Sequence, residues 1–233
     1  TADGRVTSFI RFLERNPDTP YRKEAEQNIF EVMTSEHSVG GYELFLRSYP
    51  KSHLRKKAID FAYHVSKESE DKLNTKYYSD SLRVVSSFAG DALYAFLETG
   101  KFGFIDSNGT TVIPPTFDEI HEQYKCASFT ADFLLADNKV LGRNNAIILN
   151  DQPEEVVDLG YGLLKIGKKG RWKVVHKSGR VVRANAANEI KLLKGNLLAI
   201  KSGNEWKIET IGGRLLVSDS FEEVFTAGEG KVP

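Results

Sequence analysis

Two series of internal repeats, each of a different kind, restrict what this sequence can fold into. Residues 6–30 match residues 39–63 at a constant offset of 33 (39 minus 6). The matched positions are mostly aromatic, apolar, small or basic, and they are Phe9 with Tyr42, Phe12 with Phe45, Leu13 with Leu46, Pro17 with Pro50, Arg22 with Arg55, Lys23 with Lys56, Ala25 with Ala58 and Phe30 with Tyr63. A unit this short cannot bury its own apolar face, so the copies are expected to stack on one another.

Each copy of the first series has the spacing of a helical hairpin. Apolar residues recur at i, i+3 and i+4, a proline follows, and a second helical stretch begins after it. Pro17 and Pro50 are expected to end the first helix, and Thr19 and Ser52 to cap the second. The pattern, above all Phe-Leu-Arg-Ser-Tyr-Pro-Lys-Ser at 45–52, resembles the tetratricopeptide-type repeats of bacterial envelope proteins over about residues 4–66.

From about residue 82, β-branched and aromatic runs separated by glycine turns replace the helical spacing. Four units align, and their closing residues Ile120, Val156, Ile190 and Val224 are 36, 34 and 34 positions apart. Each unit is expected to contain a β-hairpin, a third apolar stretch and an acidic-apolar closing element. The expected first strands are 92–96, 133–136, 163–166 and 197–200, the second strands 102–105, about 140–141, 172–175 and 206–208, the third stretches 111–113, 181–182 and 215–217, and the closing elements 117–120, 154–156, 188–190 and 221–224.

The first β-unit, over 100–115, closely resembles the WG repeat of bacterial proteins. Phe102 stands where that repeat usually has tryptophan, and the later copies have Trp172 and Trp206, with Lys173 and Lys207 in place of the following glycine. The resemblance covers about residues 82–233. It implies an interaction module rather than an enzymatic activity.

These patterns predict an α+β chain. We expect N-terminal α-helical hairpin repeats over 1–66, a linker or connecting helix over 67–81, and an antiparallel all-β repeat array over 82–233, arranged as an open solenoid or propeller-like. The last repeat is truncated, and the chain starts without methionine, which indicates a fragment or a mature chain after removal of a signal peptide. A periplasmic or cell-envelope location is therefore favoured over the cytoplasm.

The net charge of zero hides a strong separation of charge along the chain. Residues 161–214 carry 13 basic and 3 acidic residues (+10), whereas residues 71–160 carry 7 basic and 14 acidic residues (−7). A basic face with an interleaved aromatic can bind nucleic acid or an envelope polysaccharide. The candidate binding residues are Lys165, Lys168, Lys169, Arg171 and Lys173 around Trp172, with the repeated helical pairs Arg22-Lys23 and Arg55-Lys56.

Plainer interpretations of the same residues remain open. The lysines and arginines are expected at solvated turns and outward strand positions, or in charge pairs between neighbouring repeats or between molecules. Phe102, Trp172 and Trp206 could form a stacking platform for a sugar or peptide. We expect them instead in the shared core, because residues at the same place in every repeat normally pack there.

No catalytic pattern stands out, and we expect a non-enzymatic protein. The five histidines have no metal-ligand spacing, and there is no nucleophile elbow, phosphate-binding loop or dinucleotide fingerprint. Cys126 with His121 is a weak thiol and base pair, since Cys126 and His121 have no counterparts in the other repeats. We therefore predict no catalytic or metal-binding residue and no cofactor, and a scaffold that binds a protein partner, with an anionic polymer as the alternative ligand.

Overall fold

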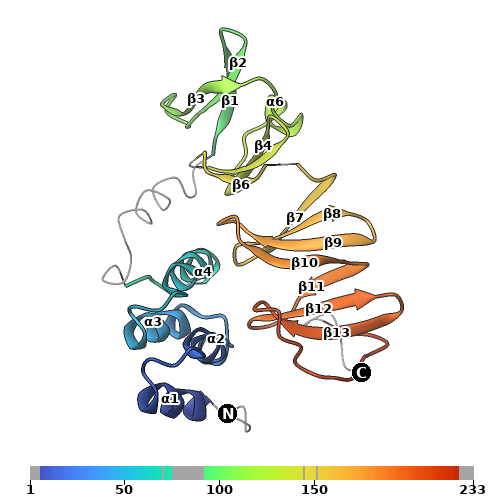
Figure 1. Cartoon of the computed structure of the whole chain (residues 1–233). Helices are drawn as coiled ribbons and strands as arrows, with labels where there is room; N and C mark the ends of the chain where they lie inside the picture. Colours follow the sequence, from blue (N-terminus) through green and yellow to red (C-terminus); the bar gives the residue numbers. More distant parts are fainter. Residues whose placement is uncertain (1–5, 70, 75–91, 144, 151, 226–233) are drawn as a thin grey trace.

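A computed structural model describes residues 6–69, 71–74, 92–143, 145–150 and 152–225. It confirms the predicted α+β class: a stack of helices is followed by small antiparallel sheets (Figure 1). None of the helices in the described residues is long and apolar enough to cross a membrane.

The helical repeats form two hairpins at the predicted offset. They consist of α1 (Val6–Arg15) with α2 (Arg22–Met33), and α3 (Val39–Ser48) with α4 (Arg55–Glu68). The expected caps were wrong, because α2 and α4 begin after Tyr21 and Leu54, which make no side-chain cap. Thr19 and Ser52 instead accept the backbone N–H two residues ahead, at 3.3 and 3.2 Å, and so stabilise the turn before each helix.

Within the described residues the strands form four antiparallel sheets. The first is β1-β2-β3, the second β4-β5-β6, the third β10-β9-β8-β7 and the fourth β11-β12-β13. The strands are β1 (Tyr94–Glu98), β2 (Lys101–Ile105), β3 (Thr111–Phe117), β4 (Phe133–Ala136), β5 (Lys139–Gly142), β6 (Ile147–Leu149), β7 (Glu155–Gly160), β8 (Leu163–Lys168), β9 (Arg171–His176), β10 (Val181–Ala187), β11 (Glu189–Leu192), β12 (Leu197–Ser202) and β13 (Glu205–Thr210).

The repeat is visible in the strand register. In three units the repeated aromatic residue pairs with the residue 15 positions after it. The pairs are Phe102 with Phe117, Trp172 with Ala187 and Trp206 with Phe221. Two of the four predicted closing elements take a different place from the one expected. β7 and β11 pair with the first strand of the next unit, so they begin the following sheet instead of closing the preceding one.

Several local expectations were wrong or incomplete. The stretch 215–217 forms no strand, and only Leu215 makes an isolated bridge, to Glu209. The strand β6 and the short helix α6 (Gln123–Cys126) were not foreseen. Of the expected linker, residues 67–68 belong to α4, while 70 and 75–81 lie outside the described residues, as do 82–91 and 226–233.

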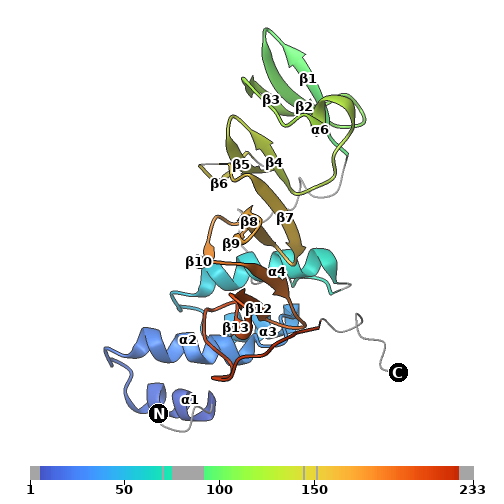
Figure 2. The ribbon, with the colours of Figure 1, turned by 90° about the vertical axis from the view of Figure 1, so that its right-hand side faces the viewer.

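The sheets follow one another in a column, and the described part does not close into a ring (Figures 1 and 2). An open solenoid is therefore the arrangement observed. The third sheet joins two hydrophobic clusters: Trp172 and Val174 face the helices and the fourth sheet, whereas Ile166 and Val175 face the first two sheets. The helical hairpins and β7–β13 thus share one cluster.

Glycines let the helices approach the sheets closely. A Cβ at Gly162, between β7 and β8, would lie 2.6 Å from atoms of His64 on α4. One at Gly195, between β11 and β12, would lie 2.6 Å from the Ser35 carbonyl oxygen. These turns would have to move apart from the helices if they carried side chains.

Candidate functional site

The predicted basic cluster around Trp172 is divided between the two faces of the third sheet. Lys165 lies on the face of Trp172, with its Nζ 4.6 Å from the ring centroid. Lys168 and Arg171 are cross-strand partners on the opposite face, which Lys173 shares. Lys168 makes an ion pair of 3.0 Å with Glu154, and Lys169 is exposed in the β8–β9 turn.

Further basic residues of the 161–214 segment are compensated within the chain. Lys177 Nζ lies 2.7 Å from a carboxylate oxygen of Asp158 and 3.3 Å from one of Asp132. Arg180 pairs with Asp60 of α4 at 3.3 Å, and Arg183 pairs with Glu209. Part of the charge separation seen in the sequence therefore becomes pairing between strands, between sheets, and between a sheet and α4.

The repeated basic pairs of the helices lie at the start of α2 and α4, away from the basic residues of β8, β9 and the turn between them. Arg22 donates to Glu26 and to the Pro17 carbonyl, both at 2.9 Å, and Lys56 pairs with Asp60 at 3.1 Å. Lys23 is exposed and Arg55 is half-buried. The structure does not unite the nine predicted residues into one site.

The repeated aromatics are mainly core residues. Trp172 is 7% exposed and Trp206 is 4% exposed, which leaves no open ring face for a sugar or peptide. Phe102 is half-buried against the cluster of the first two sheets. The expectation of a shared core is confirmed for both tryptophans.

A cluster of buried histidines, which sequence reasoning missed, lies where the helices meet the third sheet. We call His37, His64 and His176 the histidine joint. His176 stacks on Phe61 of α4 with ring centroids 4.2 Å apart, and His64 approaches it edge-on at 4.9 Å. The three positions are far apart in the sequence and none has metal-ligand spacing, so no local signal predicts their meeting.

Burial keeps the histidine joint neutral. It lowers the pKa of His37 to about 4, and it lowers the pKa of His64 although the nearby Asp132 opposes the shift. Burial, followed by the charges of neighbouring basic groups, holds the pKa of His176 well below its usual value. Burial alone would raise the pKa of Asp132, but His64, Lys67 and the charge of Lys177 together hold it well below its ordinary range.

The other histidine and the cysteine form no site. His121 and Cys126 are both exposed, and His121 Nδ1 accepts only a long hydrogen bond of 3.4 Å, from the Gln123 backbone. No group of three histidine, cysteine or acidic side chains in the described residues is arranged to hold a metal ion.

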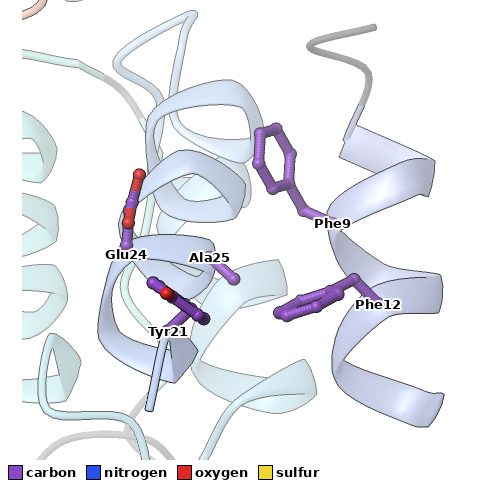
Figure 3. A pocket seen from close by; sticks show the side chains of 5 residues that line it. All are labelled: Phe9, Phe12, Tyr21, Glu24 and Ala25. Atoms are coloured by element: carbon purple, nitrogen blue, oxygen red, sulfur yellow. The ribbon is translucent and has the colours of Figure 1, made fainter. Parts of the chain in front are cut away.

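An open aromatic pocket lies between α1 and α2, with a volume of about 310 Å³ (Figure 3). We call it the end groove. It is lined by Phe9, Phe12, Tyr21, Glu24 and Ala25. In Figure 3, Phe12 projects from α1 toward Ala25 of α2 and toward Tyr21, which precedes α2, and Phe9 lies further along the same side of α1. Tyr21 is 64% exposed. Phe9, Phe12 and Ala25 were predicted as repeat positions, but no sequence pattern predicted the groove.

The repeat gives the end groove a direct internal comparison. At the offset of 33, its five residues correspond in the second hairpin to Tyr42, Phe45, Leu54, Lys57 and Ala58. There Tyr42 and Phe45 are fully buried, and Phe30 of α2 packs against both rings. In the first hairpin, among the described residues, the matched Phe9 and Phe12 are only half-buried, whereas Ala25, like Ala58, is buried.

No protein-family model, curated protein or solved structure matches this chain. The resemblances to tetratricopeptide-type and WG repeats therefore stay predictions.

Proposed function

We propose that this protein is a non-catalytic interaction module that binds a partner protein through the end groove. The observation that carries the proposal is the comparison of the two hairpins. The aromatic positions that Phe30 of α2 covers in the second hairpin are half-buried in the first, beside the exposed Tyr21, among the described residues. The end groove has an apolar lining, which is suited to protein contact.

A capture experiment with two variants tests this proposal. Extract from cells that express the protein is passed over the wild-type chain, over Phe9→Ala with Tyr21→Ala, and over a variant with Lys168, Lys169, Arg171 and Lys173 changed to Ser. A protein retained by the wild type and by the lysine-arginine variant, and lost from the groove variant, supports the proposal. Equal retention by all three would oppose it.

The second candidate function is binding of an anionic polymer at the β8–β9 turn. Lys169, Arg171 and Lys173 are exposed there and favour this alternative. In that case the same capture experiment recovers nucleic acid or polysaccharide, and the lysine-arginine variant loses it. Polymer affinity would also fall steeply as salt is added, whereas an apolar contact at the end groove would change little. For the interaction module, we propose a place at the bacterial cell envelope.

A further inference from the structure

His176 is the most deeply buried member of the histidine joint. It is the last residue of β9, and its side chain is completely covered. Its ring stacks on Phe61 of α4, and His64 of the same helix approaches it edge-on. On the side of the sheet, a Cβ at Gly162 would lie 2.6 Å from its Nε2 atom. The ring is therefore held between α4 and the third sheet.

The hydrogen bonds of His176 favour its neutral form. Its Nδ1 atom accepts the Ser178 backbone N–H at 3.1 Å and lies 2.7 Å from the Ser178 hydroxyl. A neutral ring with an accepting Nδ1 carries its hydrogen on Nε2. That Nε2 atom is buried and has no hydrogen-bond partner in the described part of the chain. A second proton on Nδ1 would take the acceptor from the Ser178 N–H, and the charged ring would still have no acceptor at Nε2.

The charges around His176 also oppose a proton there. The cationic or titratable neighbours are His37 and Tyr42 at the start of the second hairpin, Lys57, Tyr63, His64 and Lys67 of α4, Arg143 after β5, Tyr161 between β7 and β8, and Lys177 and Arg180 after β9. The nearby carboxylates are Asp60, Asp132 and Asp158, each with a basic partner, and Glu68, which accepts the Tyr161 backbone N–H. A proton on His176 would thus add positive charge to a buried site whose described carboxylates are already paired.

The other histidine of this contact is placed differently. Nδ1 of His64 lies 3.7 Å from a carboxylate oxygen of Asp132, which would stabilise a protonated ring. His176 has no ion pair with a carboxylate in the described residues, and burial, followed by the charges of His64, His37 and the basic neighbours, holds its pKa well below the usual value. It therefore takes up a proton far more readily once α4 has moved away and water reaches the ring.

The helices and the sheets are joined mainly by side chains. Arg180 pairs with Asp60 of α4 at 3.3 Å, and Phe61 and Leu163 belong to the shared cluster, at 1% and 0% exposure. The sheets themselves are held by backbone ladders, such as the six paired positions of β8 and β9. The contact between helices and sheets can therefore open while these ladders stay intact.

From this geometry we propose that the histidine joint is an acid-operated release: a proton on His176 separates the helical hairpins from the third and fourth sheets, while the sheets keep their strands. The opened contact exposes apolar side chains such as Phe61 and Leu163. The protein then presents in acid a surface that is covered at neutral pH. This inference goes beyond the proposed function and does not depend on the end groove.

Hydrogen–deuterium exchange of the full chain at pH 7.5 and at pH 5.0 tests the release. Exchange rates are converted to protection factors, which removes the intrinsic effect of pH. The backbone N–H groups of Tyr161 and Asn196 report on docking, because their acceptors, the Glu68 carboxylate and the Ser35 carbonyl, lie on the helical side. The N–H groups of the β8–β9 ladder report on the sheets.

Two variants are measured beside the wild type. His176→Asn keeps an acceptor for the Ser178 N–H and cannot be protonated at this position. His121→Asn, at an exposed histidine, is the matched control.

For the wild type we expect the protection of Tyr161 and Asn196 to fall at least about tenfold at pH 5.0, while the β8–β9 ladder stays within about twofold. One histidine whose pKa returns to 6.5 on exposure supplies up to about thirtyfold (ten to the power 6.5 minus 5.0). The fall should be at least about threefold smaller in His176→Asn and unchanged in His121→Asn.

Three results would overturn the proposal. They are no fall in the wild type, an equal fall in the wild type and in His176→Asn, and a loss of protection in the β8–β9 ladder together with Tyr161 and Asn196. The first and third need no variant, so the test remains decisive even if His176→Asn does not fold.

Discussion

At the scale of single residues, the lysines near the tryptophans illustrate how one pattern supports two interpretations. Lys165 Nζ lies 4.6 Å from the Trp172 ring, and Lys191 and Lys201 lie 5.4 and 5.6 Å from the Trp206 ring. In a sequence, basic residues interleaved with an aromatic residue suggest a polyanion-binding site. Here the cations contact buried rings of their own chain and contribute to stability.

Truncating a repeated tryptophan should therefore cost stability. Trp206→Ala is expected to lower the free energy of unfolding by roughly 3–5 kcal/mol, because the ring is almost completely buried. Phe102→Ala, at the same repeat position but half-buried, should cost less. Urea unfolding followed by circular dichroism measures both, and a larger loss for Phe102→Ala would contradict the assignment of Trp206 to the core.

Lys177 should matter more than the other lysines of its segment. It is buried between Asp132 and Asp158, so Lys177→Met removes the cation that they share, while Asp132 keeps Lys67 at 2.9 Å. Because one carboxylate keeps a partner and the other is partly exposed, we expect a loss of about 1–2 kcal/mol in the free energy of unfolding. Lys169→Met, in the exposed turn, is the matched control and should stay within about 0.5 kcal/mol of the wild type. Similar losses for both would mean that the buried ion pairs contribute little.

At the scale of elements, much of the secondary structure could be predicted, because periodicity and turn residues act locally. The offset of 33 predicted all four helices of the hairpins. The first two strands of each β-unit followed from apolar runs, which a glycine turn separates in three of the four units. The closing elements were harder. A sequence shows that 154–156 recurs at 188–190, but only the register shows that β7 and β11 pair with the following strand.

Two glycines allow the cost of backbone strain in a turn to be compared with the cost of overpacking at the histidine joint. Gly162 and Gly170 both have φ of +81°, but a Cβ at Gly162 would meet His64 and His176, whereas one at Gly170 would meet open space. Both changes to Ala should lose about 1 kcal/mol from backbone strain. Gly162→Ala should lose roughly 1–3 kcal/mol more through overpacking. Equal losses in urea unfolding would show that α4 does not lie against this turn.

The histidine joint should make stability depend on pH. The folded pKa values of its histidines are lowered, so the unfolded chain binds protons more readily, and stability is full above about pH 6.5 and falls as the pH drops toward about 4. His37 alone would account for on the order of 3 kcal/mol, from a difference of about 2.5 pH units (6.5 minus 4). Asp132, whose pKa is also lowered, adds to the loss at lower pH.

A histidine variant tests whether stability falls at low pH and whether the histidine joint causes that fall. His176→Asn keeps an acceptor for the Ser178 backbone N–H, which His176 Nδ1 accepts at 3.1 Å, and it removes one titrating group. Unfolding free energies measured from pH 7.5 to 4.5 should fall less steeply for this variant than for the wild type. Parallel curves would place the acid sensitivity elsewhere.

At the scale of the whole molecule, the docking of the helices on the sheets could not be read from the sequence. The contacts join residues far apart in the chain: Lys67 with Asp132 at 2.9 Å, Arg180 with Asp60 at 3.3 Å, and the Asn196 N–H with the Ser35 carbonyl at 3.1 Å. None of them leaves a local pattern. The end groove was missed for a related reason, since the repeat predicts matching positions but does not say which copy is covered.

The proposed function depends on which surface of this molecule meets its partner, and site-specific photocrosslinking tests that most directly. A photoreactive phenylalanine is placed at Tyr21 in the end groove or at Lys169 in the β8–β9 turn, both exposed. After irradiation in extract from cells that express the protein, crosslinked products are identified by mass spectrometry. We predict a protein crosslinked from position 21 and none from position 169. Nucleic acid or polysaccharide crosslinked from position 169, with no product from position 21, would contradict the account.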